Sequence, residues 1–400
     1  MELQLQFGYG MMVHSRVLIR DWGGGTVILS PRDLNPRQLQ QFADAIVSTA
    51  DGEVLLDPQF YLPYADHGRL TSHDYWPAEY STDGFWSGAE IRELIRKLVA
   101  LNTALRCKAM LLPGLYAERV DDDWLARQKL VIDEAGALTD FPLFVTVALG
   151  ADAVRSDDQI DDILAAAETW EVAGVYLVCE HPRGDYLITD PTWLANVLDL
   201  VAGLRLKNLG VVVGYCNHQM LALACVGANA IASGTWMNVR SFPPDKFRLQ
   251  YDEEIKQRAV WYYCPQALSE YKVPFLDIAL KQGVLSKMVP PEVMGSAYAD
   301  LLFSGVQPTS VKWTEQAAFR HYLQCLWSQT KDSRRDTFED TADAHERALD
   351  AAEDLLATLQ TAAVFGQRRD FRESIDANRA AISVIRSTRG PILRRKWSDL

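Results

Sequence analysis

EVLLDPQF, residues 53–60, is the stretch that decides the predicted fold. Its apolar run is short and uninterrupted, which is typical of a strand buried on both faces. Asp57 ends the run, so we expect a carboxylate at the carboxyl end of this strand. Residues 61–88 then separate the strand from the next helical pattern, and they are rich in aromatic side chains. Because loops this long are usually functional, we expect an ordered cover over a ligand site; a loop that only plugs one end of the fold is the alternative.

Similar apolar runs recur along the chain, and most are followed by a helical pattern. The predicted strands are 26–31, 54–57, 109–113, 143–149, 175–180, 211–216, 230–234 and 259–264. Strands that are apolar throughout and alternate with helices predict a parallel sheet covered on both faces. Eight such units predict an α/β fold, namely a (β/α)8 TIM barrel. An open doubly wound sheet is the alternative, although no Gly-x-Gly-x-x-Gly turn follows the first strand.

The two ends of the chain differ from this pattern. Residues 3–7 and 17–19 alternate or are apolar, and we expect them to form a small N-terminal hairpin. After residue 287 only helical patterns occur, and 338–363 and 371–385 predict an antiparallel helical hairpin with a coiled-coil-like seam. Its first arm is acidic and its second arm is basic. We therefore predict two domains, a barrel with the N-terminal hairpin over 1–287 and an all-helical extension over 288–400.

Composition limits the class of protein. The 400 residues are 48% hydrophobic, which is ordinary for a globular protein, and the net charge of -13 argues against extensive contact with phosphates. No apolar run approaches the roughly 20 residues of a membrane span, and the N-terminus has no signal pattern. The six cysteines form no Cys-x-x-Cys pair, which favours reduced thiols in a cytoplasmic protein without a structural zinc site. We predict no cofactor and no metal.

The predicted barrel brings the carboxyl ends of its strands together at one mouth, where such folds carry their chemistry. Asp57 and Glu180 are the candidate catalytic carboxylates; a structural salt bridge, for example from Asp57 to Arg32, is the alternative. His181 and His218 could ligate a metal with them, but the set is scattered over several loops. The candidate ligand-binding residues at the mouth are Gln59, His181, Gly214, Tyr215, Asn217, His218, Ser233, Thr235 and Arg240.

The turn after the seventh predicted strand is a candidate anion site. Ser233 and Thr235 flank a glycine, so the backbone N–H groups of this turn are accessible to a ligand. Arg240 follows shortly afterwards and supplies a fixed positive charge. An ordinary tight turn is the alternative.

Two stretches carry a resemblance to a known family. LDPQF at 56–60 and VGY at 213–215 resemble, in their order and position, the aspartate motif and the glycine-bearing sixth strand of the tRNA-guanine transglycosylase superfamily. This resemblance implies a (β/α)8 barrel with a nucleobase pocket at its mouth. The chain departs from the family in two respects: Ser233 lies near the position of the late nucleophilic aspartate, and the Cys-x-Cys-x-x-Cys zinc motif is absent.

Two functions follow as expectations. The first is a barrel enzyme that binds a nucleobase, a nucleotide or another planar or anionic ligand at the mouth, with transglycosylase-type nucleic-acid modification as its specific form. The second is an inactive barrel that acts as a scaffold subunit through its C-terminal helices. The same helices are candidates for a homodimer or complex interface. The basic tail at 394–397 is a candidate nucleic-acid contact, with a solvated terminus as the alternative.

Overall fold

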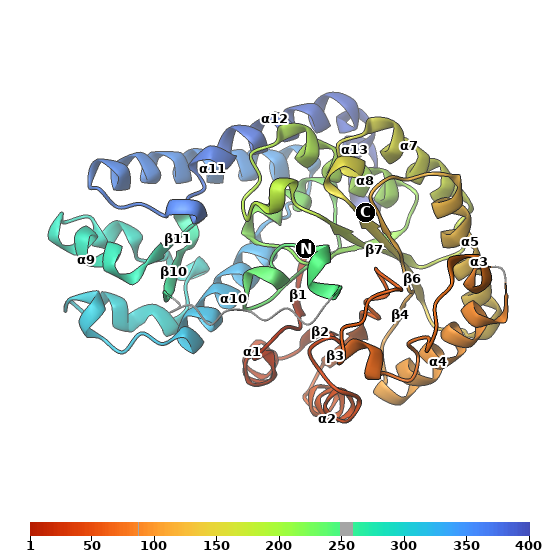
Figure 1. Ribbon diagram of the computed structural model, residues 1–400. Coiled ribbons are helices and arrows are strands. Elements are labelled where there is room, and N and C mark those ends of the chain that lie inside the picture. Colours follow the sequence, from red (N-terminus) through yellow and green to blue (C-terminus); the bar gives the residue numbers. More distant parts are fainter. Residues whose placement is uncertain (87, 249–258) are drawn as a thin grey trace.

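A curled sheet of eight parallel strands forms the centre of the protein (Figure 1). The computed structural model describes residues 1–86, 88–248 and 259–400. The strands lie in the order β3-β2-β1-β9-β8-β7-β6-β4, and the short β5 pairs with β6. The α/β class and the parallel sheet are thus confirmed. The strand bounds are β1 Glu2–Gln6, β2 Gly25–Leu29, β3 Gly52–Leu56, β4 Met110–Leu111, β5 Tyr116–Ala117, β6 Leu143–Leu149, β7 Gly174–Cys179, β8 Gly210–Val213 and β9 Ala230–Ser233.

The two edge strands of this sheet are β3 and β4. A single backbone hydrogen bond of 3.2 Å joins them, from the N–H of Lys108 to the carbonyl of Val54. Within the described ranges no strand ladder connects β3 to β4, so the sheet is curled but is not shown to be a closed barrel.

The predicted N-terminal hairpin is wrong. β1 lies inside the sheet and pairs in parallel with β2 and β9, with Leu5 opposite Val27. Residues 17–19 belong to a helix, α1 Met11–Trp22. The alternation in β1 arises because its polar side chains face the inside of the curl, where Gln6 Oε1 accepts a hydrogen bond of 2.9 Å from the hydroxyl of Tyr176 on β7. In the sequence, a strand whose polar face points inward has the same alternating pattern as a strand whose polar face is exposed to solvent.

The eighth predicted strand lies outside the parallel sheet. β10 Trp261–Cys264 pairs antiparallel with β11 Ser269–Lys272 in a separate two-stranded sheet. Its side chains are apolar along its whole length because α10 Glu315–Asp332 packs on it, with Tyr263 and Tyr322 in ring contact at 5.0 Å. Seven of the eight predicted strands therefore belong to the parallel sheet; β1 completes its row of eight, and the short β5 is a ninth strand beside β6.

Helices follow most strands of the sheet and cover its outer face (Figure 1). Helix α2 (Pro36–Val47) is stabilised at its start by a capping box, in which the side chains of Asn35 and Gln38 each accept a hydrogen bond from the other residue's backbone N–H. The helices beside the sheet are α2 Pro36–Val47, α3 Thr82–Phe85, α4 Ala89–Leu105, α5 Asp122–Leu138, α6 Ala151–Val154, α7 Asp157–Ala166 and α8 Pro191–Leu206, and a 3-10 helix His218–Val226 precedes β9.

The C-terminal helices contain the antiparallel hairpin that the charge pattern predicts. They are α9 Val273–Lys281, α10, α11 Phe338–Thr361, α12 Arg372–Thr388 and α13 Gly390–Lys396. Arg379 on α12 pairs with Asp350 on α11 at 2.6 Å, and Arg386 pairs with Asp343 nearer the start of α11. The domain boundary at residue 287 remains a prediction.

The hairpin is docked on the rest of the protein. Arg389, just after α12, pairs with Asp199 on α8 at 2.7 Å, and α8 is buried on nearly all sides. The basic tail folds back as well, because Arg394 pairs with Glu339 on α11 and Trp397 is buried. The hairpin is therefore one layer of a larger packing unit, and a free coiled coil is not supported.

Two further findings concern the class of protein. Among the described helices none has the length and apolar character needed to cross a bilayer. All six cysteines are buried with free thiols.

Candidate functional site

Asp57 lies at the end of β3 and is completely buried. Its Oδ2 accepts hydrogen bonds from the hydroxyls of Tyr61 at 2.8 Å and Tyr215 at 2.9 Å. Its Oδ1 accepts one from the backbone N–H of Gln59 at 3.0 Å. Burial raises the pKa of Asp57 to about 6, although these hydrogen bonds act in the opposite direction. Arg32 pairs with Asp33 instead, so the salt bridge from Asp57 to Arg32, which was the alternative to a catalytic role, does not form.

Two of the predicted ligand-binding residues hold this carboxylate in place. Gln59 and Tyr215 both adopt left-handed backbone conformations, with φ of 54° and 56°. Gln59 Nε2 also donates to the Tyr215 hydroxyl at 3.2 Å. Such conformations are unfavourable for residues other than glycine, and they persist only where the surroundings enforce them. The structure therefore brings Asp57, Gln59 and Tyr215 together in one hydrogen-bonded group.

An aromatic layer covers this group. Phe242 lies 4.9 Å from the ring of Tyr61 and 5.3 Å from that of Tyr215, and Phe247 lies 4.9 Å from Tyr61. The ammonium group of Lys246 lies 4.1 Å from the centroid of the Tyr215 ring. The predicted aromatic cover thus exists in part: Tyr61 comes from the long loop, but the other rings come from the loop after β9. Asp57 is sealed beneath them.

Glu180, the second predicted catalytic carboxylate, lies at the edge of the same layer. Its Oε2 accepts a hydrogen bond from the hydroxyl of Tyr116, whose ring contacts Phe242 at 6.2 Å. His181 turns away from it: its Nδ1 lies 2.9 Å from the carbonyl of Asp185, and burial lowers its pKa to about 4. Asp57 and Glu180 are thus each bonded to a tyrosine that contacts Phe242, whereas His181 is bonded to the carbonyl of Asp185.

Two predicted residues near the sixth predicted strand have structural partners. A Cβ at Gly214 would lie 2.4 Å from the hydroxyl oxygen of Tyr176, so only glycine allows this tyrosine to reach Gln6. Asn217 caps the 3-10 helix His218–Val226 by accepting a hydrogen bond from the N–H of Gln219 at 2.8 Å. Both residues shape the backbone.

His218 is packed among aromatic rings. It lies 4.9 Å from the ring of Tyr263 and 6.0 Å from that of Tyr322. Burial lowers its pKa to about 4, so the imidazole is neutral at pH 7. In the described part of the chain no group of three or more potential metal ligands includes it or His181.

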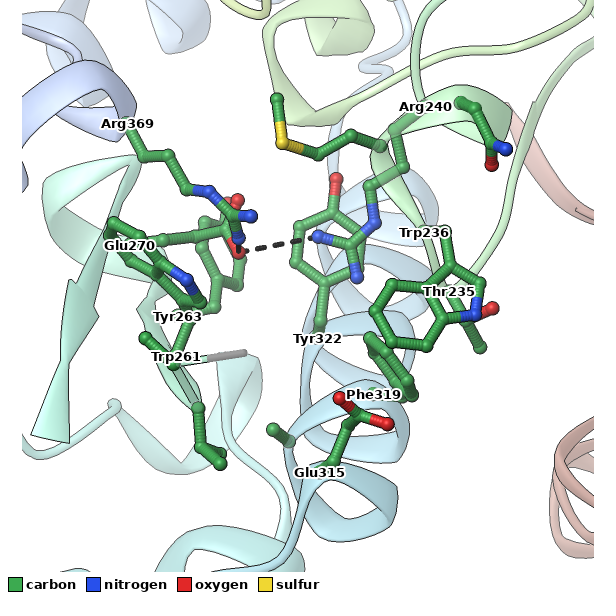
Figure 2. A pocket seen from close by; sticks show the side chains of 15 residues that line it. Thr235, Trp236, Arg240, Trp261, Tyr263, Glu270, Glu315, Phe319, Tyr322 and Arg369 are labelled. Atoms are coloured by element: carbon green, nitrogen blue, oxygen red, sulfur yellow. Dashed lines mark hydrogen bonds and ion pairs between the residues drawn. The ribbon is translucent and has the colours of Figure 1, made fainter. Parts of the chain in front are cut away.

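A cavity of about 380 Å³ lies between the loop after β9, the β10–β11 sheet and α10 (Figure 2). Its volume is within the range of roughly 300–1,000 Å³ that is typical of small-molecule sites. Two of the predicted ligand-binding residues, Thr235 and Arg240, line it, and Ser233 is buried nearby. The other lining residues that matter below are Trp236, Trp261, Tyr263, Glu270, Glu315, Phe319, Tyr322 and Arg369.

Two arginines share one buried carboxylate in this cavity. Glu270 Oε2 lies 3.3 Å from Arg240 and 2.7 Å from Arg369. Burial alone would raise the pKa of Glu270, but the guanidinium groups of Arg369 and Arg240 outweigh it and lower the pKa to about 2. The group therefore carries two positive charges and one negative charge.

Local structure fixes both partners of this ion pair. Arg240 Nε donates to the carbonyl of Gly234 at 2.8 Å, which closes the loop after β9. Glu270 faces Tyr263 across the β10–β11 ladder, so both side chains point to the same cavity. Arg369 ends the 3-10 helix Gln367–Arg369 in the turn between α11 and α12.

Aromatic rings form the walls of the cavity. Figure 2 shows Trp236 and Trp261 on opposite sides, with Tyr322 behind Arg240 between them. Phe319 is in edge contact with Trp236 at 4.7 Å, and the guanidinium of Arg369 lies 4.1 Å from the centroid of a Trp261 ring. Aromatic faces stack on planar groups and guanidiniums bind anions, so this arrangement suits a planar anion.

The sequence identified Arg240 and Thr235 but missed Glu270, Arg369 and Tyr322. These residues lie 30 or more positions from Arg240 in the chain, on elements that carry no ligand-binding motif. A partial signal existed: Arg240 follows a turn of small residues, and such a charge needs a partner if it is buried. The identity of that partner depends on long-range packing.

Comparisons with known proteins assign no family to this chain. No family model matches the chain, and no curated protein matches it. The structure is similar, at a TM-score of 0.32 and 11% identity, to dihydrodipicolinate synthase from Acinetobacter baumannii complexed with pyruvate, covering 58% of this chain and 69% of that one.

It is also similar, at a TM-score of 0.32 and 10% identity, to the carboxyl transferase domain from Rhizobium etli pyruvate carboxylase. That alignment covers 97% of this chain and 54% of that one, so this chain spans about half of its length. Neither structure is a tRNA-guanine transglycosylase, and the comparisons give the resemblance to that superfamily no support.

Proposed function

We propose that this protein binds a small planar anion in the cavity beside the loop after β9, and that any chemistry on the ligand takes place there. The observation that carries the proposal is the pair of guanidinium groups, Arg240 and Arg369, on the single carboxylate of Glu270. An anionic ligand would offset the excess positive charge of this group.

The electrostatic argument depends on burial. The side chains of Arg240 and Glu270 are 3% and 4% exposed. An unbalanced charge costs far more inside a protein than in water, because the surroundings solvate it poorly. The neighbouring His218 is neutral at pH 7 and adds no further positive charge. An anion that enters the cavity therefore gains a strong interaction with groups that are already oriented.

The aromatic walls select the shape of the anion. Trp236 and Trp261 both line the cavity and lie on opposite sides of it in Figure 2, so a flat ring that enters the cavity has aromatic side chains on either side. Nucleobases and other aromatic rings stack on such side chains with a gain of about 1–3 kcal/mol per ring. A bare anion such as inorganic phosphate would use the arginines alone.

Asp57 has a different role in this proposal. Its three hydrogen-bond partners and the aromatic layer above it support a structural role in holding Tyr61 and Tyr215. Transglycosylase chemistry is not part of the proposal, because it would need Asp57 to reach a ligand. We also infer that the sheet closes between β3 and β4 into a (β/α)8-type barrel, which the hydrogen bond from Lys108 to Val54 supports.

The scaffold alternative has less support. The ion pairs of the α11–α12 hairpin are made within the chain, and Arg389 ties α12 to α8. Trp397 in the tail is buried, which makes the tail less accessible to nucleic acid or to a second copy of the chain.

Guanosine 5′-monophosphate (GMP) and its uncharged counterpart guanosine test the proposal. We expect isothermal titration calorimetry to show GMP binding at least tenfold tighter than guanosine and than inorganic phosphate. Arg369→Gln should weaken GMP binding at least tenfold, and Arg369→Lys should retain part of the affinity. Arg368→Gln is the matched control, because Arg368 is exposed in the same turn and does not line the cavity.

Three results would overturn the proposal. One is the absence of GMP binding at millimolar concentration. Another is equal binding of GMP and guanosine, since the arginines would then contribute nothing. The third is an unchanged GMP affinity in Arg369→Gln with an unchanged melting temperature.

A further inference from the structure

We propose that the ligand carries an N–H donor, such as a ring amino group, at the end opposite its anionic group, and that Glu315 accepts this hydrogen bond. This inference rests on the proposed function and deepens it. It assigns the cavity to an extended bipolar ligand, with a negative group at one end, a planar ring in the middle and an amino group at the other end.

The two charged ends of the cavity lie along one helix face. Glu315, Phe319 and Tyr322 all line the cavity and stand at positions i, i+4 and i+7 of α10. Arg240 lies directly over the ring of Tyr322, at 3.4 Å from its centroid. At 1.5 Å per residue, seven residues separate the Glu315 and Tyr322 levels by about 10 Å along the helix axis. Figure 2 shows Glu315 at the end of the cavity away from Arg240 and Arg369.

Glu315 is available for a ligand. Its carboxylate forms no hydrogen bond or ion pair with residues of the described ranges, in contrast to Glu270 at the other end. It is also the first residue of α10, where a carboxylate is favoured by the helix dipole. The position at the helix start accounts for an acidic residue here. The position in the cavity lining makes its carboxylate oxygens accessible to a ligand.

The spacing excludes short ligands. A ligand that reaches both Glu315 and the arginine pair must span two levels of α10 whose backbone positions lie about 10 Å apart along the helix axis. Phe319 and Trp236, in contact at 4.7 Å, form an apolar surface between the two ends. A nucleoside monophosphate whose base carries an amino group has all three features in the required order: phosphate, flat ring and N–H donor.

Two nucleotides that differ only by an amino group test this inference. GMP carries the exocyclic amine that inosine 5′-monophosphate (IMP) lacks. We expect the wild type to bind GMP about tenfold more tightly than IMP, the ratio that one hydrogen bond to a charged acceptor typically supplies. Glu315→Gln keeps an acceptor oxygen but loses its charge, so it should reduce the preference for GMP over IMP, mainly by weakening GMP. Glu292→Gln is the control, because Glu292 is an exposed carboxylate of the same region outside this cavity.

The outcomes separate this inference from the function on which it rests. Equal binding of GMP and IMP by the wild type, with both dependent on Arg369 and neither weakened by Glu315→Gln, would overturn the role of Glu315 and leave the anion site intact. A GMP preference that is unchanged in Glu315→Gln would also overturn it. If Glu315→Gln lowers the melting temperature and leaves the GMP preference unchanged, Glu315 only stabilises the start of α10. Failure of both nucleotides to bind would overturn the proposed function itself.

Discussion

The guanidinium of Arg240 lies 3.4 Å from the centroid of the Tyr322 ring and 3.3 Å from the carboxylate of Glu270. The first contact is made by its flat face and the second by its edge. A buried guanidinium held in both ways cannot turn without losing a cation–π contact or a charged hydrogen bond. The cavity therefore presents a fixed positive surface, which is the property that a site for an anion needs.

Replacing Glu270 should lower stability in a pH-dependent way. The folded-state pKa of about 2 lies below the ordinary value of 4.5, so Glu270 stabilises the protein above pH 4.5 and loses this effect as the pH falls toward 2. We expect Glu270→Gln to cost on the order of 3 kcal/mol at pH 7, because two buried guanidiniums lose their anion. Urea unfolding at pH 7, 5 and 3.5 should show the gap between wild type and variant closing only below pH 4.5. A gap that stays constant at pH 3.5 would contradict the lowered pKa.

Asp57 should show the opposite dependence. Its folded-state pKa is raised from 3.8 to about 6, so the folded protein takes up a proton before the unfolded chain does. Stability contributed by Asp57 therefore rises as the pH falls from 6 toward 4. Relative to Asp57→Asn, the wild type should gain roughly 2 kcal/mol over this window. Urea unfolding of both proteins at pH 7.5, 6.0 and 4.5 measures the difference. If the difference is flat, the carboxylate keeps the same charge throughout and burial does not dominate its environment.

Gly214→Ala should disturb the inside of the sheet. The new Cβ would lie 2.4 Å from the Tyr176 hydroxyl oxygen, which is held by its hydrogen bond to Gln6. Forcing an extra methyl group into a packed interior typically costs about 1–3 kcal/mol. Gly68→Ala is the control, because nothing lies within 4 Å of a Cβ there. We expect the free energy of unfolding to fall for Gly214→Ala and to change by less than about 0.5 kcal/mol for Gly68→Ala. Equal effects at the two positions would show that Tyr176 can move aside.

The docking of the C-terminal hairpin can be tested on α12. Ile382 is 1% exposed and Val384, two residues further on the same helix, is 45% exposed. A buried aspartate without a partner costs several kcal/mol, so Ile382→Asp should lower stability by about 3 kcal/mol or more. Val384→Asp should stay within about 0.5 kcal/mol of the wild type. Thermal unfolding monitored by circular dichroism compares the two. Tolerance of Ile382→Asp would mean that the hairpin is separable from the rest of the fold.

Much of the fold was predictable because the burial of a strand or helix requires apolar residues at regular positions in its own sequence. The run LFVTVAL of β6 is apolar at nearly every position since both faces of a parallel strand are covered. The opposite charges of α11 and α12 likewise predicted their antiparallel pairing. β1 and β10 were assigned wrongly for one shared reason. A strand's sequence records whether a face is polar, but it does not record which sheet the strand joins or whether the polar face points inward.

Local sequence patterns were enough to predict an α/β protein of parallel strands, with Asp57 at the end of a strand and Arg240 after a turn of small residues. Which residues share a cavity depends on how distant parts of the chain pack together. Arg240, Glu270, Tyr322 and Arg369 come from a loop, a strand, a helix and a turn spread over 130 positions of the chain. Periodicity and turn chemistry act over a few neighbouring residues, whereas the partner of a buried charge depends on the packing of the whole chain.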